Sequence, residues 1–148
     1  MIKKIIVVFV MGIILFSLGG CSKEETLKDG YYTARMDGYD HEGWQEFVTI
    51  VVSNGEIVTV EYNAKASSGF IKSWDIAYMR MMNPIQGTYP NNYTRRYAAS
   101  FLESQSSEDI DIVSGASTSG ANFKLLTAAL LEKAKAGDSS VAIVAYPS

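Results

Sequence analysis

The sequence predicts an α+β domain in which helices pack on a mostly antiparallel sheet. Two β-rich segments, 46–53 and 56–63, are joined by Asn54-Gly55, and an Asn-Gly step in this position is a strong signal for a tight β-hairpin. A long segment of helical periodicity covers 119–136, and shorter β-rich segments lie before the hairpin and after this helix. These observations together predict one domain built from strands and helices.

The first strand is expected at 30–36, followed by a loop at 37–43 that holds two glycines and three acidic residues. In 46–53 both faces are largely apolar, which predicts an interior strand covered on two sides. The side chains of 56–63 alternate between two faces. One face is expected to carry Val58, Val60 and Tyr62, and the other Thr59, Glu61 and Asn63.

Two shorter helices are expected after the hairpin. One covers 73–82 with Asp75 in its first turn, and the other covers 92–103. The segment between them, 83–92, is expected to be a loop because it holds two of the three prolines and a glycine. The helical spacing in the second helix is that of Tyr93, Tyr97 and Phe101.

The clearest helix is expected at 119–136, and a closing strand at 141–146. Gly137 directly follows the helix, which is typical of a helix C-terminus. The apolar stripe of this helix consists of Phe123, Leu126, Leu130 and Ala134.

The composition is that of one globular domain and excludes several classes of protein. The chain has 148 residues, of which 47% are hydrophobic and 20% charged. A net charge of −3 argues against a nucleic-acid-binding protein, which needs a basic surface. The single cysteine, Cys21, and the single histidine, His41, exclude a disulfide framework, a multi-cysteine metal or iron–sulfur site and a histidine-rich metal centre.

The N-terminal segment has the pattern of a secretory signal. Lys3 and Lys4 precede an apolar stretch at 5–18, which is shorter than the roughly 20 residues needed to span a bilayer. The following Leu18-Gly19-Gly20-Cys21 resembles the lipobox of bacterial lipoproteins. An uncleaved anchor and an ordinary signal with a chance cysteine are the alternatives.

The lipobox resemblance implies three parts of the chain. Residues 1–20 would be a lipoprotein signal peptide, 21–29 a lipidated tether and 30–148 the folded domain. Cys21 would carry the lipid and become the new N-terminus. The domain would then be anchored to the cell membrane by lipid, on its extracytoplasmic face.

The sequence holds no self-contained catalytic motif. A nucleophile–base pair would have to use His41, which lies in an acidic loop and is expected to be solvated. The phosphate-loop, dinucleotide and zinc-protease motifs do not occur in the sequence. Asp37, Asp40 and Glu42 cluster in the same loop without the spacing of a calcium loop, so we expect a solvated acidic loop. The sequence therefore favours a function other than catalysis.

The segment Asp111–Ser119 places small hydroxyl residues directly before the clearest helix. Gly115 and Ala116 leave room for another surface to approach the backbone, and Ser117 and Thr118 precede the free N–H groups of the helix. An anion there gains from these donors and from the helix dipole, so the site suits a phosphate, free or esterified to a hydroxyl. An ordinary helix N-cap after a Ser/Gly turn is the alternative.

The same segment resembles a covalent-flavin motif. Asp111-x-x-Ser114-Gly115-Ala116-Ser117 is similar to the D-x-x-[ST]-G-A-[ST] flavinylation motif of the FMN-binding domain family. That family includes the flavin subunits of the Rnf and Nqr ion-pumping complexes and the flavin lipoproteins of extracellular electron transfer. The resemblance extends over 28–135. It includes Lys28-Asp29-Gly30-Tyr31-Tyr32, Gly43-Trp44 through Phe47, Asn54-Gly55-Glu56-Ile57, Lys72-Ser73 with Asp75 and Tyr78, and Phe123 through Leu130.

The resemblance implies a role for each motif residue. Ser117 matches the acceptor hydroxyl, to which an ApbE-type flavin transferase would esterify the phosphate of FMN taken from FAD. Serine stands here where threonine is commoner in the family, and both carry the required hydroxyl. Thr118 and Ser119 are adjacent hydroxyls and are alternative acceptors. The positions that the transferase reads are matched by Asp111, Ser114, Gly115 and Ala116.

The resemblance thus implies a membrane-anchored, extracytoplasmic flavoprotein that carries electrons through FMN and is not itself an enzyme. Electrons would come from a membrane-bound reductase and pass to a downstream carrier or an extracellular acceptor. A module that holds FMN without a covalent bond and a non-redox structural or inhibitory lipoprotein are the alternatives. The aromatic side chains that could stack on the flavin, or else pack in the core or at its rim, are Trp44, Trp74, Tyr78 and Tyr89.

Overall fold

The computed structural model describes residues 26–147. The expected signal peptide at 1–20, the lipidation site Cys21 and the first half of the tether lie outside the described residues. The elements in chain order are β1 (Gly30–Met36), β2 (Gln45–Ser53), β3 (Glu56–Lys65), the 3₁₀ turn η1 (Lys72–Trp74), α1 (Ile76–Gln86), α2 (Pro90–Ser104), α3 (Ser117–Ala136) and β4 (Ala142–Val144).

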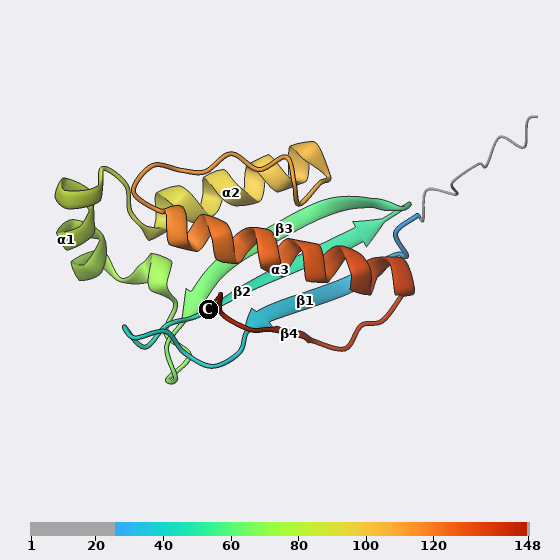
Figure 1. The fold of residues 1–148 in the computed structure, drawn as a ribbon, viewed down its shortest axis with the longest axis horizontal. Helices are drawn as coiled ribbons and strands as arrows, with labels where there is room; N and C mark the ends of the chain where they lie inside the picture. The colour runs from blue at the N-terminus through green and yellow to red at the C-terminus, as the bar shows by residue number, and fades with distance from the viewer. Residues whose placement is uncertain (1–25, 148) are drawn as a thin grey trace, which may run out of the picture.

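The four strands form one sheet in the order β3-β2-β1-β4. The first three strands pair antiparallel, and β4 pairs parallel to β1. Helices α2 and α3 lie side by side across one face of this sheet, and α1 projects from one end of the molecule (Figure 1). The α+β class with a mostly antiparallel sheet is therefore confirmed. Between residues 26 and 147, no helix has the length and apolar character needed to cross a membrane.

The predicted hairpin joins β2 to β3 at Asn54-Gly55. Both residues have positive φ, 54° and 79°, as this type of two-residue turn requires. The pairing shifts by one residue beside Val51, so Val58 is the extra residue of a β-bulge. The expectation that Val58 shares a face with Val60 and Tyr62 is therefore wrong, and the Val58 side chain is 49% exposed.

Strand β2 is interior, as expected, because it lies between β1 and β3. Its Val48 and Ile50 are fully buried under the helices. The expectation that its second face is also covered is wrong, since Phe47 and Val51 remain half-buried on the open side of the sheet. On this face the side chain of Lys65 from β3 packs beside Phe47, with its ammonium 6.0 Å from the centre of the ring.

The core forms where α2 and α3 meet the sheet. The ring of Phe123 is the centre of this cluster, with ring centroids of Tyr62 at 4.6 Å, Tyr97 at 5.6 Å and Phe101 at 6.0 Å. Such contacts bury large apolar area and add specific ring–ring attraction. The predicted stripe of α3 is confirmed, since Phe123, Leu126, Leu130 and Ala134 are all fully buried.

The boundaries of α1 and α2 differ from the expectation. Asp75 is the N-cap of α1, because its carboxylate accepts a hydrogen bond from the Tyr78 amide at 2.9 Å. The expected loop at 83–92 is shorter, since α1 continues past Pro84 and ends at Gly87, whose φ of 70° is left-handed. Pro90 does not interrupt a loop but occupies the first turn of α2, where its missing N–H costs nothing.

Helix α3 begins two residues earlier than expected, at Ser117, with Ala116 as its N-cap. The preceding turn is held by a buried side chain of α2. The Tyr97 hydroxyl accepts a hydrogen bond from the Val113 amide and donates one to the Ala116 carbonyl, each at 2.9 Å. At Gly120, an added Cβ would lie 2.4 Å from the same hydroxyl. The start of α3 is thus packed directly against α2.

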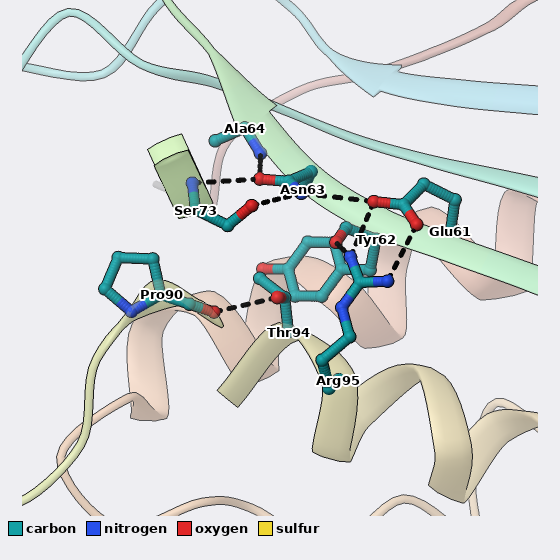
Figure 2. A network of polar contacts seen from close by, with 8 residues as sticks. All are labelled: Glu61, Tyr62, Asn63, Ala64, Ser73, Pro90, Thr94 and Arg95. Carbon is teal, nitrogen blue, oxygen red and sulfur yellow. Dashed lines mark hydrogen bonds and ion pairs between the residues drawn. The ribbon is translucent and has the colours of Figure 1, made fainter. Parts of the chain in front are cut away.

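A polar network attaches η1 and α2 to β3 (Figure 2). The Asn63 amide donates to the Ser73 hydroxyl at 2.8 Å, and its oxygen accepts from the Ser73 backbone amide at 3.3 Å. The guanidinium of Arg95 binds both oxygens of the Glu61 carboxylate, at 2.9 and 2.6 Å. This network fixes the position of η1, and therefore of its first residue, Lys72, at the end of the sheet.

The variant Tyr97→Phe is expected to lose about 1–3 kcal/mol of stability, because it leaves a buried amide and a buried carbonyl without a partner. Urea unfolding measures the loss. The matched control is Tyr31→Phe, since Tyr31 is 73% exposed and its loss should change stability by less than about 0.5 kcal/mol. Equal stability of the two variants would contradict the role assigned to Tyr97.

Candidate functional site

A cavity of about 550 Å³ lies between the N-terminus of α3, the η1 turn and the loop before β2. This volume is within the range of sites for small molecules and cofactors. A second hollow of about 530 Å³ adjoins it along α1, and Ser117 and Thr118 border both. The first cavity is lined by Asp40, His41, Glu42, Glu46, Lys72, Tyr78, Met82, Tyr93, Gly115, Ala116, Ser117, Thr118, Ser119, Ala121, Asn122, Tyr146 and Pro147.

The structure brings four of the six predicted cofactor residues to the wall of this cavity. They are the consecutive Gly115 to Thr118, at the turn into α3. Asp111 and Ser114 do not line either hollow, and both are exposed on the outer side of the same turn. The predicted segment therefore has one side toward the cavity and another toward solvent.

Gly115 has the close backbone approach that the sequence suggests, but the approaching group belongs to the protein itself. Its φ is +81°, and an added Cβ would lie 2.1 Å from the carbonyl oxygen of Gln86 at the end of α1. Any larger residue would force α1 away from the turn. Gly115 therefore fixes one wall of the cavity.

The first turn of α3 presents hydrogen-bond donors to the cavity. Because Ala116 is the N-cap, no side chain caps these amides. Ser117 and Thr118 are exposed residues of the first turn, and not residues preceding the helix as the sequence suggested. Free amides and the positive end of the helix dipole favour an anion beside these hydroxyls.

Lys72, which the sequence matched only as part of the family resemblance and without a role, supplies a cation to the same cavity. The residue is only 7% exposed, and its ammonium lies 3.5 Å from the Glu42 carboxylate. Two aromatic rings flank it, that of Tyr78 at 4.8 Å and that of Trp44 at 5.5 Å. Ring faces attract cations, so this pocket holds the charge in place with little water.

The acidic loop forms one wall of the cavity. The Asp40 carboxylate accepts hydrogen bonds from the amides of Glu42 and Trp44, at 2.9 and 2.8 Å, and so fixes the turn. His41 and Glu42 are exposed, as expected for a solvated loop. The Tyr78 hydroxyl donates to Glu42 at 2.9 Å, and burial together with this carboxylate raises the Tyr78 pKa.

Glu46 is a second residue that the sequence analysis missed. It is 6% exposed, forms hydrogen bonds with the Tyr62 hydroxyl at 2.8 Å and with the Asn122 amide at 2.6 Å, and lines the cavity. Burial raises the pKa of this carboxyl group, and the hydrogen bonds from Asn122 and Ser119 oppose that shift only in part.

Of the four aromatic residues considered for stacking, Tyr78 lines the cavity. Trp44 packs edge-on behind it with ring centroids 6.3 Å apart, Trp74 is 67% exposed on another surface, and Tyr89 borders neither hollow. The cavity also contains two aromatic residues that the sequence analysis did not predict. They are Tyr93 and Tyr146, and burial raises the pKa of Tyr146 to about 12.

No family model matches the chain. The 15 kDa lipoprotein of Treponema pallidum (strain Nichols) is 33% identical to it over 126 residues, which cover 85% of this chain and 89% of the relative. A Clostridium perfringens protein of known crystal structure superposes with a TM-score of 0.78 at 32% identity, over 82% of this chain and 99% of that chain.

A Clostridium thermocellum protein solved by NMR has a TM-score of 0.51 at 27% identity, over 73% of this chain and 92% of that chain. The fold is therefore shared with two clostridial proteins. Because the identity with the Treponema protein extends over most of both sequences, this chain belongs to the family of the 15 kDa lipoprotein.

Proposed function

We propose that this protein is a lipid-anchored electron carrier that holds FMN through a phosphoester bond to Ser117. The observation that carries the proposal is the position of Ser117. The acceptor residue of the flavinylation-like motif is an exposed residue of the first turn of α3 and borders two adjoining hollows of about 550 and 530 Å³. A hydroxyl there is open to a transferase and lies beside room for a ring system.

The donors around this hydroxyl suit a phosphate and an electron-rich ring. Uncapped amides of the α3 first turn favour the negative charge of the phosphodiester. The ammonium of Lys72 supplies a fixed positive charge within the cavity. FMN itself would supply the redox chemistry, while the chain positions it and sets the local charge.

Attachment requires no base from this chain, because an ApbE-type flavin transferase would supply the chemistry. The Ser117 oxygen would bond to the phosphorus of the FMN half of FAD, the pyrophosphate bond would break, and AMP would leave with the released proton. Exposure separates Ser119 from the other two neighbouring hydroxyls. Ser117 and Thr118 are exposed, whereas Ser119 is half-buried beside Glu46 and Tyr93.

A covalent bond suits a cavity that is open to solvent. A tethered ring is held at an effective concentration of about millimolar or above, so a shallow site stays occupied without tight binding. A non-covalent cofactor released outside the cell would be diluted and lost. Loss of an untethered cofactor by dilution therefore favours covalent attachment over the non-covalent FMN module.

The proposed location is the extracytoplasmic face of the cell membrane, with lipid on Cys21. The lipobox-like residues before Cys21 and the name of the Treponema relative support the lipid anchor. Electrons would reach the flavin from a membrane-bound reductase and leave to a downstream carrier or an extracellular acceptor.

A non-redox structural or inhibitory lipoprotein is the second candidate function. It is favoured by the local roles of the turn residues, since Gly115 is required by the approach of Gln86 and the turn itself is held by Tyr97. These contacts explain the small residues of the motif without any cofactor. They do not explain an exposed hydroxyl beside a cavity that contains a buried lysine.

Co-expression with an ApbE-type flavin transferase is expected to give a protein band that fluoresces after denaturing electrophoresis. Ser117→Ala is expected to lose this band and Thr118→Ala to retain it, since only the first removes the acceptor oxygen. Circular dichroism of both variants checks that each is folded. Yellow protein that bleaches on denaturation would support the non-covalent module, and colourless protein the non-redox function.

Lys72→Met is expected to lower the flavin midpoint potential by roughly 30 mV, equivalent to about 1.4 kcal/mol for a two-electron couple. The variant keeps the buried stem but removes the positive charge that stabilises the electron-rich reduced ring. Spectroelectrochemistry of the flavin-loaded protein measures the shift. Lys65→Met, on the open face of the sheet beside Phe47, is the control and should leave the potential unchanged. Equal potentials for both variants would exclude Lys72 from the flavin environment.

A further inference from the structure

The floor of the cavity holds an acid that the proposed function does not use. Glu46 lies on β2, is 6% exposed and has three hydrogen-bond partners, Tyr62 of β3 and Asn122 and Ser119 of α3. Asn122 of α3 donates to its Oε2 at 2.6 Å, and the hydroxyl oxygen of Tyr62 of β3 lies 2.8 Å from its Oε1. No ion pair of Glu46 occurs within residues 26–147, although its carboxyl group is nearly inaccessible to water.

The Tyr62 hydroxyl has two hydrogen-bond contacts, and both cannot be satisfied by its single proton when Glu46 is ionised. The Tyr62 hydroxyl lies 2.8 Å from Glu46 Oε1 and 2.9 Å from the Ser119 carbonyl oxygen. Both distances are typical of O–H···O hydrogen bonds, yet the hydroxyl has a single proton to donate. The carbonyl can only accept. If Tyr62 donates to Ser119, the contact with Glu46 is satisfied when the carboxyl group donates to Tyr62.

The groups that surround Glu46 favour the neutral acid. Burial disfavours the carboxylate, and the hydrogen bonds with Asn122, Ser119 and Tyr62 together with the charge of Lys72 offset this effect only in part. The neighbouring tyrosines stay neutral at neutral pH, because burial raises the pKa of each. The groups that face Glu46 are Tyr62 of β3, Lys72 of η1, Tyr93 of α2, Ser119 and Asn122 of α3, Tyr146 after β4, and across the cavity Asp40, His41 and Glu42.

We propose that Glu46 is a protonated carboxylic acid in the folded protein at neutral pH and that it donates its proton to a ligand reduced in the cavity. The donation of this proton to a reduced ligand rests on the proposed function. Two electrons come from the reductase, and the proton leaves the Glu46 carboxyl group for the reduced ligand. Tyr62 then turns its O–H from the Ser119 carbonyl to Glu46 Oε1, so the new carboxylate accepts from Tyr62 and Asn122. Oxidation of the ligand, or water at the cavity mouth, returns the proton.

The apoprotein tests the protonation state without any flavin. Carbon-13 NMR of glutamate-labelled apoprotein is expected to show one carboxyl resonance that still has the chemical shift of a protonated acid at pH 7 and is lost in Glu46→Gln. The substitution is a neutral mimic, because its NH₂ group can donate to Tyr62 while its oxygen accepts from Asn122. Chemical shifts of ionised carboxylates for every glutamate at pH 7 would overturn the proposal.

Stability gives a second readout with a defined sign. Because its pKa is raised in the folded protein, the contribution of Glu46 to folding stability is fully present below its unfolded-state pKa of about 4.5. That contribution is lost as pH rises through the folded-state pKa. The Glu46→Gln variant should therefore gain stability relative to the unsubstituted protein as pH rises through that window. The control is Glu61→Gln, whose parent carboxylate pairs with Arg95 and has a lowered pKa. It should lose stability relative to the parent as pH rises through the Glu61 titration.

Flavin-loaded protein tests the proton transfer itself. The midpoint potential plotted against pH is expected to bend where Glu46 titrates, and this bend should vanish in Glu46→Gln but persist in Glu61→Gln. Identical curves for all three proteins would overturn the transfer. Apoprotein that shows the raised titration but never takes up FMN would overturn the proposed function and the transfer with it, while supporting the protonated state of Glu46.

Discussion

A single buried hydroxyl determines where the candidate acceptor lies. Tyr97 extends from the middle of α2, and its oxygen bridges the amide of Val113 and the carbonyl of Ala116. This bridge closes the turn at Gly115, so that α3 begins at Ser117, at the edge of the cavity. The same ring packs on the central aromatic of the core. Core packing and site geometry therefore share one contact, and a change that loosens the turn also displaces the candidate acceptor hydroxyl.

The charges of the cavity are arranged at a cost to stability. Burying a charge or a polar group is unfavourable unless partners replace the lost water. Lys72 has one exposed carboxylate and two rings around it, and Glu46 has hydrogen bonds but no ion pair within the described residues. A domain selected for stability alone would fill such positions with apolar side chains. Buried titratable groups that face a cavity are instead typical of functional sites.

The features predicted correctly from the sequence are those that depend on residues close together along the chain. The Asn54-Gly55 turn and the apolar stripe of α3 are confirmed because each depends on residues close in sequence. The helix boundary was wrong because Pro84 was interpreted as a breaker, whereas Gly87 ends the helix. Of the residues that line the cavity, the sequence predicted as site residues only those of the 111–119 motif. Glu46 and Asn122 meet across 76 positions of sequence, and the one available signal was a carboxylate on the same face of β2 as Val48 and Ile50.

Covalent flavin on Ser117 is tested most directly by peptide mass spectrometry of protein purified from its native host. A digest yields the peptide that contains residues 111–119, and fragmentation places any added mass on a single side chain. The expected result is the mass of FMN less one water on Ser117, with the Thr118 and Ser119 hydroxyls unmodified. A peptide that carries no added mass, in cells that express a flavin transferase, would contradict covalent flavin at this site.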